Sequence, residues 1–207
     1  MAIFSYVLVR DYGFAPNPFY AVCTLATCKP LIRGKACVGD WVLGFGSCAN
    51  RTVMGKLIYA MKVEMKCTFD EYWNAPEFQR KKPVMNGSLK QKYGDNIYHH
   101  GKNGEWIQED SHHKNADGTI NEKNLNRDTK KDCVLISRQY WYWGKDAIPI
   151  PDTLQELVKK GRNHKEKKSL ILENTLEKWL HSFKVKGYIG KPAKFSGKFE
   201  RYDGDLS

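Results

Sequence analysis

A chain of 207 residues is long enough to bury one full hydrophobic core but short for two domains, so we expect a single domain over residues 1–207. Its 41% hydrophobic and 28% charged residues are ordinary for a globular protein, and no apolar run approaches the roughly 18 residues of a membrane span. The net charge of +11 at pH 7 favours a nucleotide or nucleic acid as partner, and a basic protein without such a partner is the alternative.

The N-terminal segment predicts a strand followed by a rigid loop. Residues 3–9, IFSYVLV, are β-branched and aromatic, which is typical of a buried strand. The segment Gly13–Pro18 holds two prolines, which favour extended geometry before them, and this loop carries Phe14 and Phe19. No basic segment precedes the apolar run and no cleavage site follows it, so we expect a cytoplasmic protein.

The next segments predict two strands and a helix. A Gly-Asp turn within residues 38–47, VGDWVLGFGS, leads into a strand, and alternating apolar positions over residues 57–65 indicate a second, half-buried strand. Thr68 and Glu71 have the spacing of a capping box, so a helix begins there, and Pro76 limits it.

The rest of the chain alternates between polar and ordered segments. Residues from about 80 to 132 form a polar insertion without clear periodicity, and such regions are often functional. Residues 133–144 predict a strand with one face in the core and one face open to stacking. A short helix is expected at residues 152–160 and an amphipathic C-terminal helix at about 170–184, before a frayed tail, YDGDLS.

The cysteines raise two chemical possibilities. In a reducing compartment they are thiols or ligands, and we expect no metal and no cofactor, because no segment combines Cys23 and Cys28 with a second close pair of ligands in a zinc spacing. The histidine doublets that could supply nitrogens are His99-His100 and His112-His113. Cys28 precedes Lys29, so a nucleophilic thiolate is conceivable, but the sequence alone places no histidine beside it, and a small buried thiol is the alternative.

The stretch CTLATCKPLIR, residues 23–33, better fits an anion site. Thr24 and Thr27 offer hydroxyl donors, Lys29 a point charge and Arg33 a planar fork for phosphate oxygens. The alternative is a loop whose threonines cap neighbouring backbone and whose charges face water.

Two further groups of residues could read a base. Aromatic residues make up 13% of the chain, and bases stack on such rings for about 1–3 kcal/mol each. The candidate rings are Phe14, Trp41, Tyr140 and Trp143. In YGDNIYHH, residues 93–100, Asp95 and Asn96 could bond a base edge and His99 could act as acid or base, although a plain turn is the alternative.

Several long stretches resemble the nucleotide-modification-associated domain family, second type, of bacteria and phages. They are RDYGFAPNPFYAVCTLATCKPLIR, VGDWVLGFGS, MKCTFDEYWNAPEFQRKKPVMNGSLKQKYGDNIYH and VLISRQYWYWG, and the resemblance runs from about residue 3 to residue 150. It implies a role in making or handling modified DNA bases without naming a reaction. The matching positions are Asp11, Asn17, Thr24, Cys28, Lys29, Arg33, Asp95, Asn96 and His99.

A weaker resemblance concerns architecture. The order of turn, strands and capped helix is similar to the PUA-like class, which includes EVE-type domains that grip modified bases in aromatic pockets. The long polar insertion departs from that pattern. The resemblance implies an α+β fold in which a curved sheet forms a partly closed mixed β-barrel with flanking helices.

Together these observations lead to one main hypothesis and two rivals. We expect a domain that binds a nucleotide or modified nucleobase, with phosphate against Lys29 and Arg33 and with Asn17, Thr24 and Thr27 nearby. The base would stack on one of the candidate rings while Asp95 or Asn96 reads its edge. The rivals are an enzyme that modifies or cleaves a nucleotide with His99 and Asp95, or Asp11, and a basic module that binds DNA or protein without reading bases. We expect no membrane partner.

Overall fold

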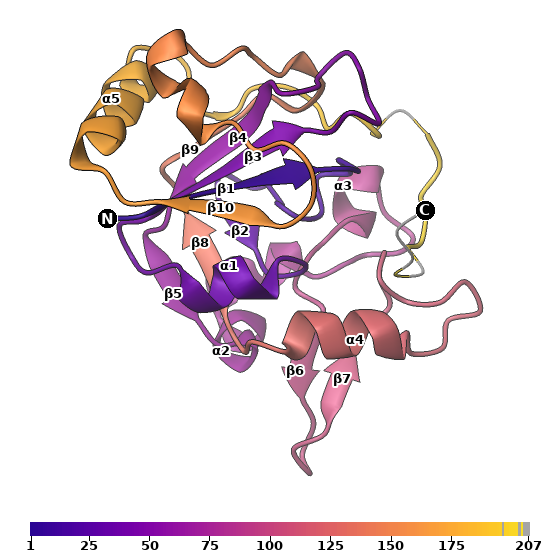
Figure 1. Ribbon diagram of the computed structural model, residues 1–207. Coiled ribbons are helices and arrows are strands. Elements are labelled where there is room, and N and C mark those ends of the chain that lie inside the picture. The colour runs from indigo at the N-terminus through magenta and orange to yellow at the C-terminus, as the bar shows by residue number, and fades with distance from the viewer. Residues whose placement is uncertain (196, 203, 205–207) are drawn as a thin grey trace.

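A six-stranded mixed sheet forms the centre of the molecule (Figure 1). The structure is a computed structural model, and it describes residues 1–195, 197–202 and 204. The strand order is β10-β1-β3-β4-β9-β11, in which β1 pairs with β3 and β9 with β11 in parallel and the other pairs are antiparallel. The strands are β1 (Ile3–Leu8), β3 (Trp41–Gly46), β4 (Leu57–Lys62), β9 (Tyr140–Tyr142), β10 (His164–Lys167) and β11 (Gly187–Tyr188).

Two smaller sheets and short helices complete the α+β fold. The three-stranded sheet is β2 (Cys23–Leu25), β8 (Val134–Ser137) and β5 (Met65–Cys67), and β6 (Tyr98–His100) pairs with β7 (Trp106–Gln108). The α-helices are α1 (Pro30–Lys35), α2 (Phe69–Asn74), α3 (Leu89–Lys92), α4 (Glu122–Thr129) and α5 (Leu170–His181). The 3-10 helices are η1 (Pro76–Lys81), η2 (Gly144–Asp146) and η3 (Asp152–Leu157).

Both faces of the central sheet are covered, because its strands alternate between two apolar clusters. Trp41, Leu43 and Phe45 of β3 pack on the side of η3 and α5, where Leu176 and Leu180 are fully buried. On the other face, β1 packs against β2, β8 and α1. A third cluster lies beyond the three-stranded sheet, around α2 and η1.

The expected barrel is not found. β10 and β11 are the two edges of an open sheet, and the smaller sheets pack against it without closing it. The amphipathic helix expected at about residues 170–184 is confirmed: it is α5, and its N-cap is Ser169. Among the described residues, no helix has the length and apolar character needed to cross a lipid bilayer.

The middle of the chain confirms some expectations and corrects others. Thr68 and Glu71 form the capping box at the start of α2. The 3-10 helix η1 begins at Pro76, after the end of α2. The strand expected over residues 57–65 ends at Lys62, and the polar insertion contains α3, β6, β7 and α4. The predicted strand at residues 133–144 is two strands, β8 and β9, and neither face of β9 is open.

Candidate functional site

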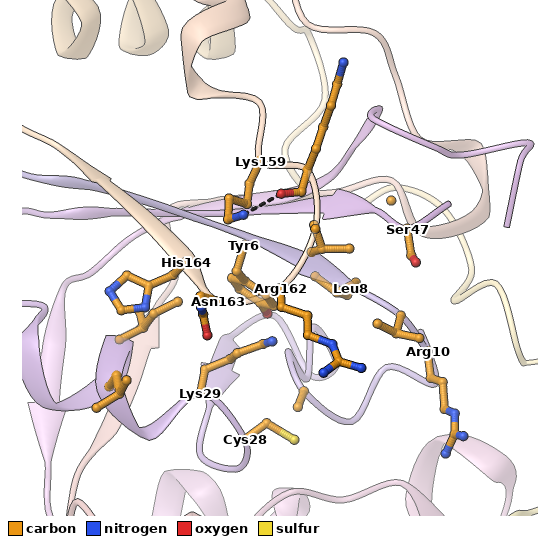
Figure 2. A pocket seen from close by; sticks show the side chains of 18 of the residues that line it. Tyr6, Leu8, Arg10, Cys28, Lys29, Ser47, Lys159, Arg162, Asn163 and His164 are labelled. Atoms are coloured by element: carbon orange, nitrogen blue, oxygen red, sulfur yellow. Dashed lines mark hydrogen bonds between the residues drawn. The ribbon is translucent and has the colours of Figure 1, made fainter. Parts of the chain in front are cut away.

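A cavity of about 1190 Å³ opens beside the C-terminal half of β1. Residues 28–32, the connector at residues 158–163 and His164, the first residue of β10, form much of its wall. Residues from α4 and the C-terminal segment close another side. Figure 2 shows the side chains of Cys28, Lys29 and Arg162 extending into the same space. Binding pockets for small ligands typically measure about 300–1000 Å³, so this cavity has room for a nucleotide.

The charged side chains of the cavity wall are basic. No aspartate or glutamate lines it within the described part of the chain. The lysines and arginines are Arg10, Lys29, Lys123, Arg127, Lys159, Lys160 and Arg162. Clefts lined by charges of one sign focus their field, so this wall attracts anions.

Aromatic rings lie among these charges. Lys29 Nζ lies 4.7 Å from the centroid of the Tyr6 ring, and Arg10 Cζ lies 4.9 Å from that of Tyr202. The rings of the wall are Tyr6, Tyr12, Phe14, His112, His113, His164 and Tyr202. Cationic groups next to rings suit a ligand that combines an anion with a heterocycle.

Cys28, His113 and Asp128 form a chain of contacts at this wall. Cys28 Sγ lies 3.9 Å from His113 Nε2, and His113 Nδ1 lies 2.7 Å from Asp128 Oδ2. The second carboxylate oxygen, Oδ1, accepts a hydrogen bond of 2.9 Å from the backbone N–H of Cys28. His113 and Asp128 are buried, whereas Cys28 is half-buried and lines the cavity. Asp128 therefore orients both the histidine and the cysteine.

Local charges set the protonation of these groups. Burial raises the pKa of the Cys28 thiol, but the contact with His113 outweighs it, so the pKa lies below its usual value. Burial lowers the pKa of His113, but the Asp128 carboxylate and its hydrogen bond raise it to about 9. The pKa of Asp128 is depressed although burial opposes this, because His113, Arg127 and Arg33 are cationic neighbours. Both shifts favour a thiolate next to an imidazolium, compared with an isolated cysteine and histidine.

Arg33 fixes the backbone around this chain of contacts. Its Nε donates to the Cys28 carbonyl over 2.9 Å and its Nη1 to the Lys131 carbonyl over 2.9 Å. It also donates to the carbonyls of Cys133 and Asp128. The guanidinium is fully buried. Arg33, expected to hold phosphate, instead ties the turn at Cys28 to the end of α4.

Three other predicted anion and edge-reading residues, Asn17, Thr24 and Asp95, lie in a buried network outside the cavity wall. Thr24 Oγ1 donates to Asp95 over 2.6 Å, and Tyr72 donates to the same carboxyl. Lys81 Nζ donates to Asn17, both at the carbonyl and at Oδ1. Burial raises the pKa of Asp95 and lowers that of Lys81 to about 8. This network fastens the loop before β2 to η1.

Two predicted polar residues are fully buried outside the cavity wall. Asn96 donates to the Tyr72 carbonyl over 2.9 Å. The hydroxyl of Thr27 has no hydrogen-bond partner within the described residues.

The predicted stacking rings separate into two groups. Phe14 lines the cavity, and its ring centroid lies 4.6 Å from that of His113. Trp41 and Trp143 are buried in the cluster under α5, and Tyr140 is buried on the opposite face, where it donates to the Pro18 carbonyl.

The predicted acid and base residues His99 and Asp11 are not part of the cavity wall. His99 Nε2 contacts Glu109 Oε1 at 2.9 Å, and its ring stacks on Trp73. Asp11 accepts a hydrogen bond from Tyr142 and another from the Ala193 N–H, and burial raises its pKa.

The sequence did not single out several residues of the cavity wall or of the chain of contacts that starts at Cys28. From the sequence, His113 is a candidate only as a metal ligand. Asp128, Arg162 and Tyr202 belong to no sequence motif that would identify them as site residues. Cys28 is 85 residues from His113 and 100 from Asp128, so their proximity is a product of the tertiary fold. In the described part of the chain, no group of three or more histidine, cysteine, aspartate or glutamate residues is arranged to hold a metal ion.

Comparison with known proteins gives one match. Comparison with curated proteins and with solved structures gives none. The family model described as nucleotide modification associated domain 2 matches residues 1–199, which is nearly the whole chain and includes Cys28, His113 and Asp128. The chain therefore belongs to the nucleotide modification associated domain 2 family.

Proposed function

We propose that the cavity beside β1 binds a nucleotide or a modified nucleobase. The observation that supports this most directly is its wall, where the charged side chains are basic and lie between aromatic rings. The family links the chain to nucleotide modification, which makes a nucleotide the natural anion for this wall. In this proposal Lys29 and Arg162 contact the phosphate, and Phe14 and Tyr202 flank the base.

Calorimetric titration with deoxynucleoside 5′-monophosphates, with their base-modified forms and with inorganic phosphate tests this proposal. Lys29→Asn is a suitable variant, because Lys29 has a left-handed backbone with φ of 43° and asparagine tolerates that region. We expect Lys29→Asn and Arg162→Ala each to weaken nucleotide binding about tenfold, the loss of one charge-assisted contact. Arg138→Ala, an exposed arginine outside the cavity wall, is the control.

Two results would contradict the proposal. One is nucleotide binding that is equally strong in Lys29→Asn and in the unmodified protein. The other is binding of duplex DNA alone, with steep salt dependence and indifference to base identity, which would indicate a basic interaction module.

A further inference from the structure

The turn that carries Cys28 has an unusual backbone. Cys28 and Lys29 have φ of 57° and 43°, two consecutive side-chain-bearing residues in the left-handed region. Such a conformation is unfavourable for residues with a Cβ atom and is kept only where the surroundings impose it. Here the Asp128 carboxylate holds the Cys28 N–H and Arg33 holds its carbonyl. The result is a cysteine held at the cavity wall with its sulfur near His113.

The arrangement has the parts that a cysteine nucleophile requires. A nucleophile needs a base within reach, and the base needs a third group that fixes its ring. His113 Nε2 lies on the side of Cys28, and Nδ1 contacts Asp128 at 2.7 Å. Because Asp128 is ionised and buried, the ring presents Nε2 to the sulfur in a defined orientation.

We propose that Cys28 is the nucleophile of an acyl-transfer reaction in this cavity, with His113 as acid and base and Asp128 as a positioning residue. The acyl group is carried by the bound nucleotide, and that part of the proposal rests on the function proposed above. The acceptor is water, so the overall reaction is hydrolysis of an amide or ester. The chemistry at Cys28 itself requires no nucleotide to be demonstrated.

The reaction has two balanced halves. The Cys28 thiolate adds to the carbonyl carbon, a C–S bond forms, the C–N or C–O bond to the leaving group breaks, and His113 Nε2 gives its proton to that group. In the second half, Nε2 takes a proton from water, whose oxygen adds to the thioester carbon. The C–S bond then breaks, its electron pair returns to Sγ, and the carboxylic acid product leaves. The thiolate and imidazolium are restored.

Alkylation by iodoacetamide tests the state of Cys28, with each cysteine peptide followed by mass spectrometry between pH 4 and 9. We expect Cys28 to react at pH 6 at least about tenfold faster than Cys37, an exposed thiol outside the cavity that serves as internal reference. The charged and titratable groups that face Cys28 are Tyr6, Lys29, Arg33, His113, Arg127 and Asp128. The pH profile of alkylation therefore measures the pKa of Cys28 as these groups together set it.

Variants separate the chemistry from the packing. We expect His113→Asn to slow alkylation of Cys28 at pH 6 about tenfold or more. We expect Asp128→Asn to move the pH profile of alkylation to higher pH, because without the carboxylate the buried His113 loses its proton, and this outweighs the removal of a negative charge that raises the pKa of Cys28. The matched control is His100→Asn, because His100 Nδ1 also contacts a carboxylate, Asp70, at 2.8 Å but lies outside the cavity wall. Circular dichroism verifies that each variant is folded.

An activated ester, p-nitrophenyl acetate, tests the covalent step. We expect one acetyl group on the peptide that contains Cys28, retained at pH 5 and released faster at pH 8 in the unmodified protein than in His113→Asn. Cys28→Ser, a nearly isosteric change, is expected to lack the labile acetyl group, whereas Cys37→Ser keeps it.

The proposal is overturned if Cys28 alkylates no faster than Cys37 at pH 6, or if acetylation occurs equally in folded Cys28→Ser. These readouts use the protein without nucleotide. If calorimetry shows no nucleotide binding while Cys28 still forms the acetyl thioester, the function proposed above fails and the nucleophile remains, with a different carrier for its acyl group.

Discussion

His112 is a buried residue next to the site, and its burial affects the stability of the whole protein in acid. Its ring lies among Tyr12, Tyr93 and Phe14, and Nδ1 contacts the Glu200 carbonyl at 2.5 Å. Burial lowers its pKa to about 3, and the neighbouring imidazolium of His113 acts in the same direction. The two adjacent histidines are thus held in opposite protonation states, His112 neutral and His113 charged.

This difference predicts a loss of stability in acid. Between pH 6.5 and 3 the ring of His112 takes up a proton in the unfolded chain but stays neutral in the folded one. The unfolded state therefore binds more protons, and stability falls as pH falls through this window. His112→Phe keeps the ring packing without titrating. The unfolding free energy of both proteins is expected to decrease from pH 7 to pH 4. We expect this decrease to be about 3 kcal/mol smaller in His112→Phe than in the unmodified protein.

Urea denaturation at both pH values measures the effect. Because Asp11 and Asp95 have raised pKa values in the folded protein, each of them makes stability rise as the pH falls, which is opposite to the effect of His112. Both residues are present in His112→Phe and in the unmodified protein, so their effects cancel when these two proteins are compared. An identical acid sensitivity in His112→Phe and the unmodified protein would show that the ring is not held neutral.

At the scale of elements, α4 positions the carboxylate of the site. Asn121 caps this helix by accepting a hydrogen bond of 2.8 Å from the Asn124 N–H, and Asp128 lies in its last turn. The orientation of Asp128 toward His113 therefore depends on a helix of only eight residues. Tertiary contacts and caps stabilise a helix this short, because its own hydrogen bonds do not suffice.

Two cap substitutions separate stability from site geometry. We expect Asn121→Ala at α4 and Ser169→Ala at α5 each to lower the unfolding free energy by about 1 kcal/mol, the usual contribution of an N-cap. Only Asn121→Ala is expected to slow alkylation of Cys28 at pH 6, because α5 packs on the far face of the central sheet. Equal effects of the two variants on Cys28 would mean that α4 does not position the site.

At the scale of the whole molecule, Arg33 joins the parts. It bonds the turn at Cys28, the end of α4 and the strand entry at Cys133, which belong to segments about 100 residues apart in the sequence. Because its partners are backbone carbonyls, loss of the guanidinium leaves several buried acceptors without donors. The polar insertion consequently cannot unfold alone without disrupting the Cys28 turn.

This connection predicts a single cooperative unfolding. We expect far-UV circular dichroism and tryptophan fluorescence to give coincident urea transitions, and Arg33→Met to move both to a free energy lower by about 3 kcal/mol or more. Arg51→Met, at an exposed position, should stay within about 0.5 kcal/mol of the unmodified protein. Two separate transitions would mean that the insertion is an independent unit.

Elements with strong local signals can be predicted from the amino-acid sequence alone. The β-branched run of β1, the capping box of α2 and the apolar stripe of α5 were predictable, because each depends on residues a few positions apart. The family was predictable for a related reason, since its motifs are long stretches of adjacent residues. Lys29 and Phe14 were also identified as candidates, and both line the cavity.

Which polar residues contact one another depends on how distant segments of the chain pack together. Lys29 and Arg33 are both basic and lie four residues apart in the sequence, yet Arg33 is buried among carbonyls and Lys29 faces the cavity. Periodicity could not show that α5 covers one face of β9 or that the sheet stays open, because strand order depends on contacts between distant segments. The contacts of Cys28 with His113 and Asp128 have the same origin. Chain folding brings three segments to one wall, and no spacing within the sequence encodes their distance.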